Sequence, residues 1–548
     1  SSTESFKRTG ITNKKIIGWV KSALRFSNSA FIENLSNEIL NHYQLMGKKE
    51  AIYQIHFPKS LEKLKYAQQR LKFEELFYMQ LQFAHKHYSH KKRIKGYRFE
   101  KVGRFFNQFY KEVLPFDLTN AQKRVIKEIR KDVNSQAQMN RLLQGDVGSG
   151  KTIVAFLAML LAKDNNFQSC LMAPTEILAQ QHYATLQELG EKIAVNIYLL
   201  TGSSSRSARK EIHEGLLNGD IDILIGTHAV LEDVVQFKNL GFVVIDEQHR
   251  FGVAQRAKLW RKNNLPPHIL VMTATPIPRT LAMSVYGDLS VSVIDELPPG
   301  RKPVNTIHRY DSSRLQIFNF LKQQIAEGRQ VYIVYPLIEE SAHFDYKDLM
   351  DGYESIEREF PKPDYQIAIV HGKMKPEDKA FEMNRFVEGK TQIMVATTVI
   401  EVGVNVPNAS VMVIESTERF GLAQLHQLRG RVGRGAAKSF CILMSGLKLS
   451  KEGKERIKTM TETNDGFKIA EKDMELRGPG DMMGTQQSGL VDLRIADIQA
   501  DQGILKHSKS AAFWVIQQDI DLQEPKHQMI ANAFSQLMKK QYFWNYIS

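Results

Sequence analysis

A glycine-rich segment at residues 145–152, GDVGSGKT, has the residue spacing of a loop that holds phosphate groups, G-x-x-x-x-G-K-[ST]. It follows a short apolar run that can end a strand, and it precedes residues 153–162, which are apolar enough for a buried helix. Glycine lets the backbone approach an anion, and the start of a helix turns unpaired N–H groups toward it. We expect Lys151 to contact the β- and γ-phosphates of a nucleotide and the Thr152 hydroxyl to hold Mg²⁺. The glycines of this loop are Gly145, Gly148 and Gly150.

A pair of carboxylates further along the chain suits the same chemistry. Residues 242–249, FVVIDEQH, begin with four apolar residues typical of a buried parallel strand, and Asp246 and Glu247 stand at its C-terminal end. Open parallel sheets bind ligands at that end of their strands. We expect Asp246 to join the Mg²⁺ shell, Glu247 to orient water, and Gln248 and His249 to sense the γ-phosphate. The alternative is a strand that ends in a solvated acidic turn.

An alternation of strands and helices would position these groups, which predicts parallel sheets covered by helices. Helices are expected at residues 177–189 and 206–218. Strands are expected at residues 169–173, 196–200, 222–226, 242–245 and 269–272, and, after a Pro-rich linker at 295–304, at 330–335, 366–370, 392–396, 411–414 and 439–444. Thr and other small polar residues follow several of these strands, and they suit a phosphodiester backbone, although ordinary turns use the same residues.

Two further segments carry side chains that a nucleotide site could use. Gln122 precedes the glycine loop, at the start of a helix that Thr119 or Asn120 can cap, and its amide could pair with an adenine edge. The second segment, HQLRGRVGRG at residues 426–435, crowds three arginines at the junction of a loop and a helix. One of them could reach the γ-phosphate as an arginine finger, and the alternative is a basic turn without a ligand. These arginines are Arg429, Arg431 and Arg434.

Charge is distributed unevenly along the 548 residues. Residues 1–115 hold 22 Lys and Arg against 9 Asp and Glu, so they carry +13 of the net charge of +14. This part contains a helical pattern at residues 59–84 and then HKHYSHKKRIKGYR at residues 85–98, where aromatic and basic residues alternate. Such a stretch can contact a nucleic acid backbone, or it can be a solvated surface.

Other compositional features exclude several classes of protein. Cys170 and Cys441 lie in apolar runs and are expected in the core, and no Cys/His spacing suggests zinc. No run approaches a membrane span, and the start is not a signal peptide. We therefore expect a cytoplasmic protein. Residues 448–548 are expected to be helix-rich, and a Gly-rich loop at residues 475–489 suggests a hinge or a coupling element.

Taken in order, these strings resemble the superfamily-two helicases and, more narrowly, the RecG family of bacterial branched-DNA helicases. The chain has IHFPKS at 55–60, APTEILAQQH at 173–182, IGTHAV at 225–230, DEQHRFGV at 246–253, TATPIPRT at 273–280, IVHGKM at 369–374, ATTVIEVGVNVPNA at 396–409 and QLHQLRGRVGRG at 424–435. The string at residues 465–489 is similar to the translocation motif that RecG shares with the transcription-repair coupling factor Mfd. DEQHRFGV favours RecG, because Mfd usually has DEEQRFGV.

The resemblance implies a fold and a function. It implies two RecA-like parallel-sheet domains at residues 116–300 and 301–447, between a basic helical segment at 1–115 and a helical region at 448–548. ATP and Mg²⁺ would bind between the domains, and hydrolysis would drive movement on duplex and branched DNA, at stalled replication forks and Holliday junctions, in recombination and repair. Replication or repair proteins are further candidate partners, and a monomer is expected.

The resemblance also assigns roles residue by residue. Gln122 would recognise adenine, and Gln427, Arg431 and Arg434 would complete the ATP site from the second domain. The residues implied to contact DNA are Thr175, Thr227, His228 and Thr398, and those of the translocation element are Arg477, Gln486 and Gln487.

One feature departs from the family pattern. Family members carry an N-terminal wedge domain, an OB-fold, ahead of the helical segment, and no part of the 144 residues before Gly145 has that pattern. We therefore expect a fragment of a longer protein. Three alternatives stay open: a duplex translocase of the transcription-repair coupling type, an RNA helicase, and a DNA-binding module that ATP only gates.

Overall fold

The computed structural model describes residues 12–27, 31–247, 265–275, 289–298, 302–336, 342–397, 406–433, 435, 438–477, 493–498 and 500–545. These form two compact units. The first unit comprises Ser1–Lys92, Arg279–Asp288 and Pro479–Ser548, and the second comprises Arg93–Pro278 and Leu289–Gly478. Within the described residues, no helix combines the length and the apolar character that crossing a membrane requires.

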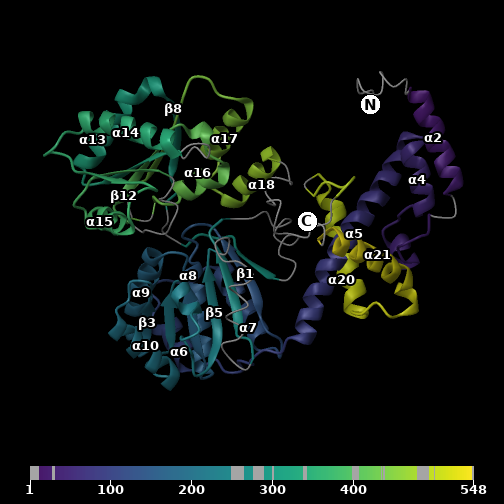
Figure 1. Ribbon diagram of the computed structural model, residues 1–548, viewed down its shortest axis with the longest axis horizontal. Helices are drawn as coiled ribbons and strands as arrows, with labels where there is room; N and C mark the ends of the chain where they lie inside the picture. The colour runs from purple at the N-terminus through teal and green to yellow at the C-terminus, as the bar shows by residue number, and fades with distance from the viewer. Residues whose placement is uncertain are drawn as a thin grey trace. The chain divides into compact units, whose positions relative to one another are not determined.

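The second unit contains two parallel sheets, as the sequence predicts (Figure 1). The first sheet has seven strands in the order β3-β4-β2-β5-β6-β1-β7, and every pairing is parallel. Its strands are β1 (Asn140–Gly145), β2 (Gln168–Met172), β3 (Ile197–Leu200), β4 (Ile223–Gly226), β5 (Leu240–Asp246), β6 (His268–Thr273) and β7 (Ser290–Ile294). Helices α7 (Asn120–Val133), α8 (Lys151–Asp164), α9 (Glu176–Glu191) and α10 (Arg206–Asn218) flank it. Every residue of β5 is buried, which explains its continuous apolar run.

The second sheet has six strands, also parallel, in the order β10-β11-β9-β12-β13-β8. They are β8 (Asn305–Tyr310), β9 (Gln330–Tyr335), β10 (Ile367–Val370), β11 (Ile393–Thr397), β12 (Ala409–Ile414) and β13 (Phe440–Ser445). Alternate residues of β9 belong to two separate apolar clusters: Val331 and Ile333 to one, Tyr332 and Val334 to the other. Since neighbouring side chains of a strand point to opposite faces, both faces of this sheet are covered.

The predicted strands are confirmed to within a few residues, but β7 and β8 were not predicted from the sequence. Both are edge strands that are only partly buried, so neither has the continuous apolar run of the central strands. The Pro-rich segment at residues 295–304 lies between them in the chain. Cys170 and Cys441 are buried in β2 and β13, as expected of core residues.

The first unit is helical and is built from both ends of the chain (Figure 1). Its helices include α2 (Asn13–Phe26), α3 (Asn37–His42), α4 (Lys48–His56), α5 (Leu61–Arg93), α20 (Gln502–Gln518) and α21 (Gln528–Asn545). One apolar cluster joins Phe73 and Phe77 of α5 to Ala512 and Val515 of α20 and Ile530 of α21. The helical tail and the helical N-terminal segment therefore share a core, which the sequence analysis did not anticipate.

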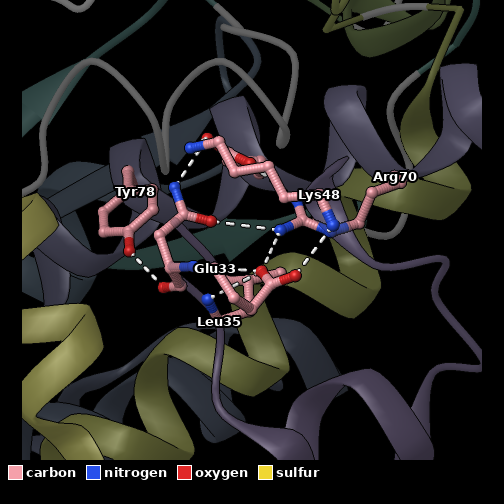
Figure 2. A network of polar contacts seen from close by, with 7 residues as sticks. Glu33, Leu35, Lys48, Arg70 and Tyr78 are labelled. Carbon is pink, nitrogen blue, oxygen red and sulfur yellow. Dashed lines mark hydrogen bonds and ion pairs between the residues drawn. The ribbon is translucent and has the colours of Figure 1, made fainter. Parts of the chain in front are cut away.

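A buried arginine holds the start of this unit together (Figure 2). Arg70 of α5 is completely buried, and its guanidinium donates to Glu33 Oε1 at 2.5 Å, to Asn34 Oδ1 at 3.0 Å and to Glu74 Oε2 at 2.7 Å. Lys48 Nζ adds a bond of 2.9 Å to Glu74. Burial alone would raise the pKa of Glu33, but the Lys48 N–H, Arg70 and the Asn34 N–H outweigh it and hold that pKa below its usual value.

We predict that Arg70→Met destabilises the first unit by about 3 kcal/mol, because loss of the buried guanidinium removes the cationic partner of Glu33, while Glu74 keeps Lys48. The partners keep some exposure, which places the loss at the lower end of the usual range. Urea unfolding and hydrogen exchange of α5 measure it. Lys63→Met is the control, since its ion pair with Glu50 is about half exposed and should contribute less than about 0.5 kcal/mol. An equal effect of the two substitutions contradicts the prediction.

A second buried group makes stability depend on pH. His268 of β6 is fully buried; its Nδ1 accepts from the Met139 N–H at 2.9 Å, and its Nε2 donates to the Tyr97 carbonyl at 2.6 Å. Burial lowers its pKa to about 4, from 6.5. The folded imidazole is thus neutral where the unfolded one takes up a proton. Its contribution to stability is complete above pH 6.5 and is lost as the pH falls toward 4.

We therefore expect His268→Gln to reduce the acid sensitivity of the second unit by about 2 kcal/mol between pH 7 and pH 5. The comparison is urea unfolding of wild type and variant at the two pH values, followed by circular dichroism. His56→Gln, an exposed histidine of α4, should leave the wild-type dependence intact. The same dependence in H268Q and wild type would contradict this origin.

Candidate active site

The glycine loop connects β1 to α8 in the first sheet. Gly148 and Gly150 have φ values of +76° and +84°, which side-chain-bearing residues rarely adopt. Gly150 is the N-cap of α8, so the first turn of the helix, whose N–H groups point toward the helix N-terminus, begins directly at the loop. The sequence pattern and the backbone conformation therefore agree on an anion-binding loop.

Gln122 fastens this loop to the start of α7. Its side chain is buried, its Oε1 accepts from the Thr119 N–H at 2.9 Å, and its Nε2 donates to the Ser149 carbonyl at 2.8 Å. Thr119, not Asn120, is the N-cap of α7, and together with Gln122 it forms a capping box. Both ends of the Gln122 amide are thus engaged. Recognition of adenine by Gln122 stays a prediction, and it would require one of these bonds to be exchanged.

The side chain of Lys151 folds back onto the glycine loop. Its Nζ donates to the Gly145 carbonyl at 2.8 Å and to the Asp146 carbonyl at 2.9 Å. A triphosphate anion is a stronger partner for an ammonium group than two neutral carbonyls. With the Thr152 hydroxyl and the start of α8 beside it, the donor set fits a nucleoside triphosphate.

The two carboxylates lie at the C-terminal end of β5. Asp246 is buried; its Oδ1 accepts from the Glu247 N–H at 3.1 Å, and its Oδ2 lies 2.8 Å from Nε2 of His182, on α9. Burial and the Asp246 charge raise the pKa of Glu247 to about 7, while Lys151, Arg431 and the Ala274 N–H oppose the rise. Glu247 therefore interacts electrostatically with Lys151 of the glycine loop and with Arg431, which belongs to the part of the unit that contains the second sheet. Gln248 and His249 lie outside the described residues.

Helix α16 (Leu422–Arg429), which belongs to the part of the unit that contains the second sheet, contacts the glycine loop. His426 Nε2 lies 2.7 Å from Asp146 Oδ1, and its Nδ1 lies 3.0 Å from Nη2 of Arg429. Because Arg429 can only donate, Nδ1 is the acceptor, and Nε2 carries the proton given to Asp146. Gln427, on the same helix, is partly exposed.

The two described arginines of this segment, Arg429 and Arg431, have different surroundings. Arg429 is buried and donates to the carbonyls of Met460 and Thr463, both at 2.9 Å, so backbone oxygens accept hydrogen bonds from its guanidinium. Arg431 is buried near Glu247. Arg434 lies outside the described residues.

The residues implied for DNA contact are only partly described. Thr175 follows β2 and caps α9, while Thr227 and His228 follow β4, the strand that pairs with β2. They therefore share one edge of the sheet, and His228 is exposed. Arg477 is the last residue of α18 (Gly466–Arg477). Thr398, Gln486 and Gln487 lie outside the described residues.

Three residues that the structure brings to this site have no role assigned from the sequence: Asp146, His182 and His426. Each lies within a string that already pointed to the family, so a signal was present. Their pairing was not visible, because Asp146 and His426 are 280 positions apart in the chain.

Comparison with known proteins places these features in families. The sequence model described as DEAD/DEAH box helicase matches residues 119–284, the one described as helicase conserved C-terminal domain matches 316–436, and the one described as ATP-dependent DNA helicase RecG, domain 3, C-terminal, matches 463–548.

Similar proteins with the name ATP-dependent DNA helicase RecG come from several bacteria. The chain is 48% identical to that of Synechocystis over 89% of its own length and 58% of the relative's, and 46% identical to that of Thermotoga maritima over 90% and 62%. It is 44% identical to that of Bacillus subtilis over 95% and 76%. A solved structure of RecG bound to a three-way DNA junction matches with a TM-score of 0.70 and 43% identity, over 91% of this chain and 65% of that one. The chain thus spans about three fifths of the first two relatives.

The geometry of the loop yields a prediction for Gly150→Ala. A Cβ at Gly150 would lie 2.3 Å from Gln122 Nε2, and φ is +84° there, so the substitution should displace both the loop and the Gln122 clamp. We expect affinity for a fluorescent ADP analogue to fall at least about tenfold, the effect of roughly 1.4 kcal/mol. Gly446→Ala is the control, since its added Cβ meets nothing within 4 Å. Wild-type affinity in G150A would contradict this account of the loop.

Proposed function

Because this chain belongs to the RecG family of ATP-dependent DNA helicases, we propose that it couples ATP hydrolysis to movement along DNA and acts on branched DNA. The observation that carries the proposal is the convergence at the glycine loop of groups from both sheets: His426, beside the second sheet, lies 2.7 Å from Asp146 of the loop, and Lys151 and Arg431 both act on the charge of Glu247. Such a convergence makes hydrolysis depend on how the two sheets meet, and that dependence is what a motor needs.

Each residue of the site has a separate role in ATP hydrolysis. Lys151 and the first turn of α8 hold the phosphates. Thr152 and Asp246 would hold Mg²⁺, which when bound neutralises charge on the phosphate oxygens. The partly buried Glu247 carboxylate orients the attacking water, and Arg431 and Arg434 stabilise charge on the transferred group. Gln122, Gln248, His249 and Gln427 complete the nucleotide contacts, and His182 keeps Asp246 in position through the 2.8 Å contact.

DNA is the proposed partner for three reasons. A RecG of known structure is bound to a three-way DNA junction. Thr175, Thr227 and His228 share a sheet edge suited to a phosphodiester backbone, and residues 1–115 carry most of the net positive charge. Stalled forks and Holliday junctions are the branched structures that we propose as substrates, in recombination and repair. We further propose a cytoplasmic monomer that replication or repair proteins recruit.

The test is steady-state ATP hydrolysis at one salt concentration with no nucleic acid, linear duplex, single strands, a three-way fork, and RNA. We expect duplex and fork to stimulate hydrolysis strongly. Lys151→Ala should reduce the rate by at least about a thousandfold, the scale for loss of a transition-state charge contact, with an unchanged circular dichroism spectrum. Lys192→Ala is the control, because Lys192 makes only an exposed surface pair with Glu188.

Each alternative function predicts a different result in the same experiment. Stimulation by RNA alone would support an RNA helicase, and duplex stimulation with no preference for forks would support a duplex translocase. ATP-dependent DNA binding without steady hydrolysis would support a gated binding module. Normal hydrolysis in K151A would contradict the assignment of the site.

A further inference from the structure

A cavity of about 600 Å³ lies beside α4, in the helical first unit. Its volume is within the usual range for cavities that bind small ligands. The lining comes from the segment before α3, from the first two turns of α4 and from Lys59, just after that helix. It brings the aromatic rings of Phe31 and Tyr53 together with three lysines. None of these residues belongs to the nucleotide site.

The carboxylates that line this cavity already have cationic partners. Glu33 is bonded to Arg70 (Figure 2), and Glu50 lies 3.3 Å from Lys63. One of the three lysines, Lys48, is likewise paired with a carboxylate outside the cavity. These charges therefore offset one another, and the remaining lysines decide the net charge of the cavity.

The remaining lysines, Lys49 and Lys59, are both exposed. Neither ammonium group has an ion pair or a hydrogen bond with the described residues. The cavity therefore has an excess of two positive charges that no carboxylate of this unit offsets. Such an excess attracts an anion, and a phosphate group is an anion that lysine commonly binds.

A nearly buried amide adds a hydrogen-bond donor to the same cavity. Gln54 of α4 is 5% exposed, and its Oε1 accepts from the Lys59 N–H at 3.0 Å, which fixes the residues after α4. Its Nε2 has no partner in the part of the chain that the structure describes. Buried polar groups are nearly always hydrogen-bonded, so this NH₂ group points to a ligand that accepts from it.

The aromatic side of the cavity is held in place. The Tyr53 hydroxyl donates to the Leu24 carbonyl of α2 at 3.0 Å, which fixes the position of the ring. Aromatic rings beside lysines are typical of sites for unpaired nucleotides, because the rings stack on bases while the cations contact phosphates. The bases of a duplex are stacked on one another, so only an unpaired strand can offer a base to a cavity.

We propose that the cavity beside α4 binds one nucleotide unit of an unpaired DNA strand, with its phosphate at Lys49 and Lys59 and its base against Tyr53. The inference rests on the proposed function, since a branched DNA opened by a helicase exposes unpaired bases. A free nucleotide has the same chemistry, and the experiment below separates the two sources. The cavity would thus hold a separated strand at a place remote from ATP chemistry.

The double variant Lys49→Gln, Lys59→Gln tests the phosphate contact. The measurement is fluorescence anisotropy of a labelled oligothymidylate, without ATP, over a series of salt concentrations. We expect the Kd to rise about tenfold and the salt slope to fall by about 0.7, the value for one phosphate of a single strand. Lys14→Gln with Lys65→Gln is the control. It removes the same charge from exposed lysines of the same unit that do not line the cavity, and it should change the Kd less than about twofold.

Two substitutions of Tyr53 test the base contact. Tyr53→Phe and Tyr53→Leu both lose the hydroxyl bond to Leu24, but only the second loses the ring. We expect Y53F to stay within about twofold of wild type and Y53L to bind the strand about tenfold more weakly, the scale of one base on an aromatic ring. An abasic strand offers no base to the ring, so wild type and Y53L should bind it equally.

Several outcomes would overturn the proposal. Equal weakening in the cavity variant and in the lysine control would mean that diffuse charge attracts the strand. Equal affinity of Y53L and Y53F for oligothymidylate would exclude the base contact. Thymidine monophosphate is titrated in parallel. If its binding requires Lys49 and Lys59 while that of the strand does not, the ligand is a free nucleotide.

Failure of the proposed function has a different signature, because strand binding is measured without ATP. Wild-type hydrolysis that no DNA stimulates, with a strand affinity that requires Lys49 and Lys59, would contradict the proposed function and leave the cavity as a strand site. Hydrolysis that DNA stimulates, with a strand affinity that does not require these lysines, would contradict the cavity alone.

Discussion

Parallel strand pairing is the constraint on which the arrangement of the second unit depends. All pairings in both sheets are parallel, so the C-terminal ends of the strands of each sheet lie at one edge. The glycine loop after β1, the carboxylates after β5 and Ala274 after β6 meet for that reason, although 129 positions separate Gly145 from Ala274. At this edge, the positive φ values of Gly148 and Gly150 determine the conformation of the glycine loop. The Gln122 side chain attaches this loop to α7 through its bond to the Ser149 carbonyl.

The parts of this fold that sequence reasoning could predict are those with a local pattern. Central strands such as β5 and β9 are continuous apolar runs because both of their faces are covered. The edge strands β7 and β8 lack such runs and were missed. The shared core of the first unit was also beyond prediction, because contacts such as Lys72 with Asp501 join residues 429 positions apart and leave no periodic trace in either segment.

The residues of the candidate site also fall into two groups, those that a local sequence pattern predicts and those that it does not. The placement of Lys151, Thr152, Asp246 and Glu247 at one edge of the first sheet could be predicted, because the chemistry expected of them requires fixed residue types at fixed spacing. The surroundings of Arg429 were not, since an arginine that satisfies backbone carbonyls cannot be told from one that awaits an anion by composition alone. His182 and His426 likewise depend on partners that only the register of the sheets and helices brings within 2.8 Å.

The positive charge of residues 1–115 likewise depends on contacts that the composition does not show. Three of their acidic residues are engaged in internal contacts: Glu33 and Glu74 with the buried Arg70, and Glu75 with backbone N–H groups. Many of their lysines, by contrast, are exposed, among them Lys49, Lys59 and Lys65. A charge offset inside the protein contributes little to the field felt by a ligand, whereas an exposed one attracts it. Because the internal pairs of Glu33 and Glu74 also engage two cations, Arg70 and Lys48, the excess of 22 over 9 is carried by the exposed residues, which favours a polyanion as their partner.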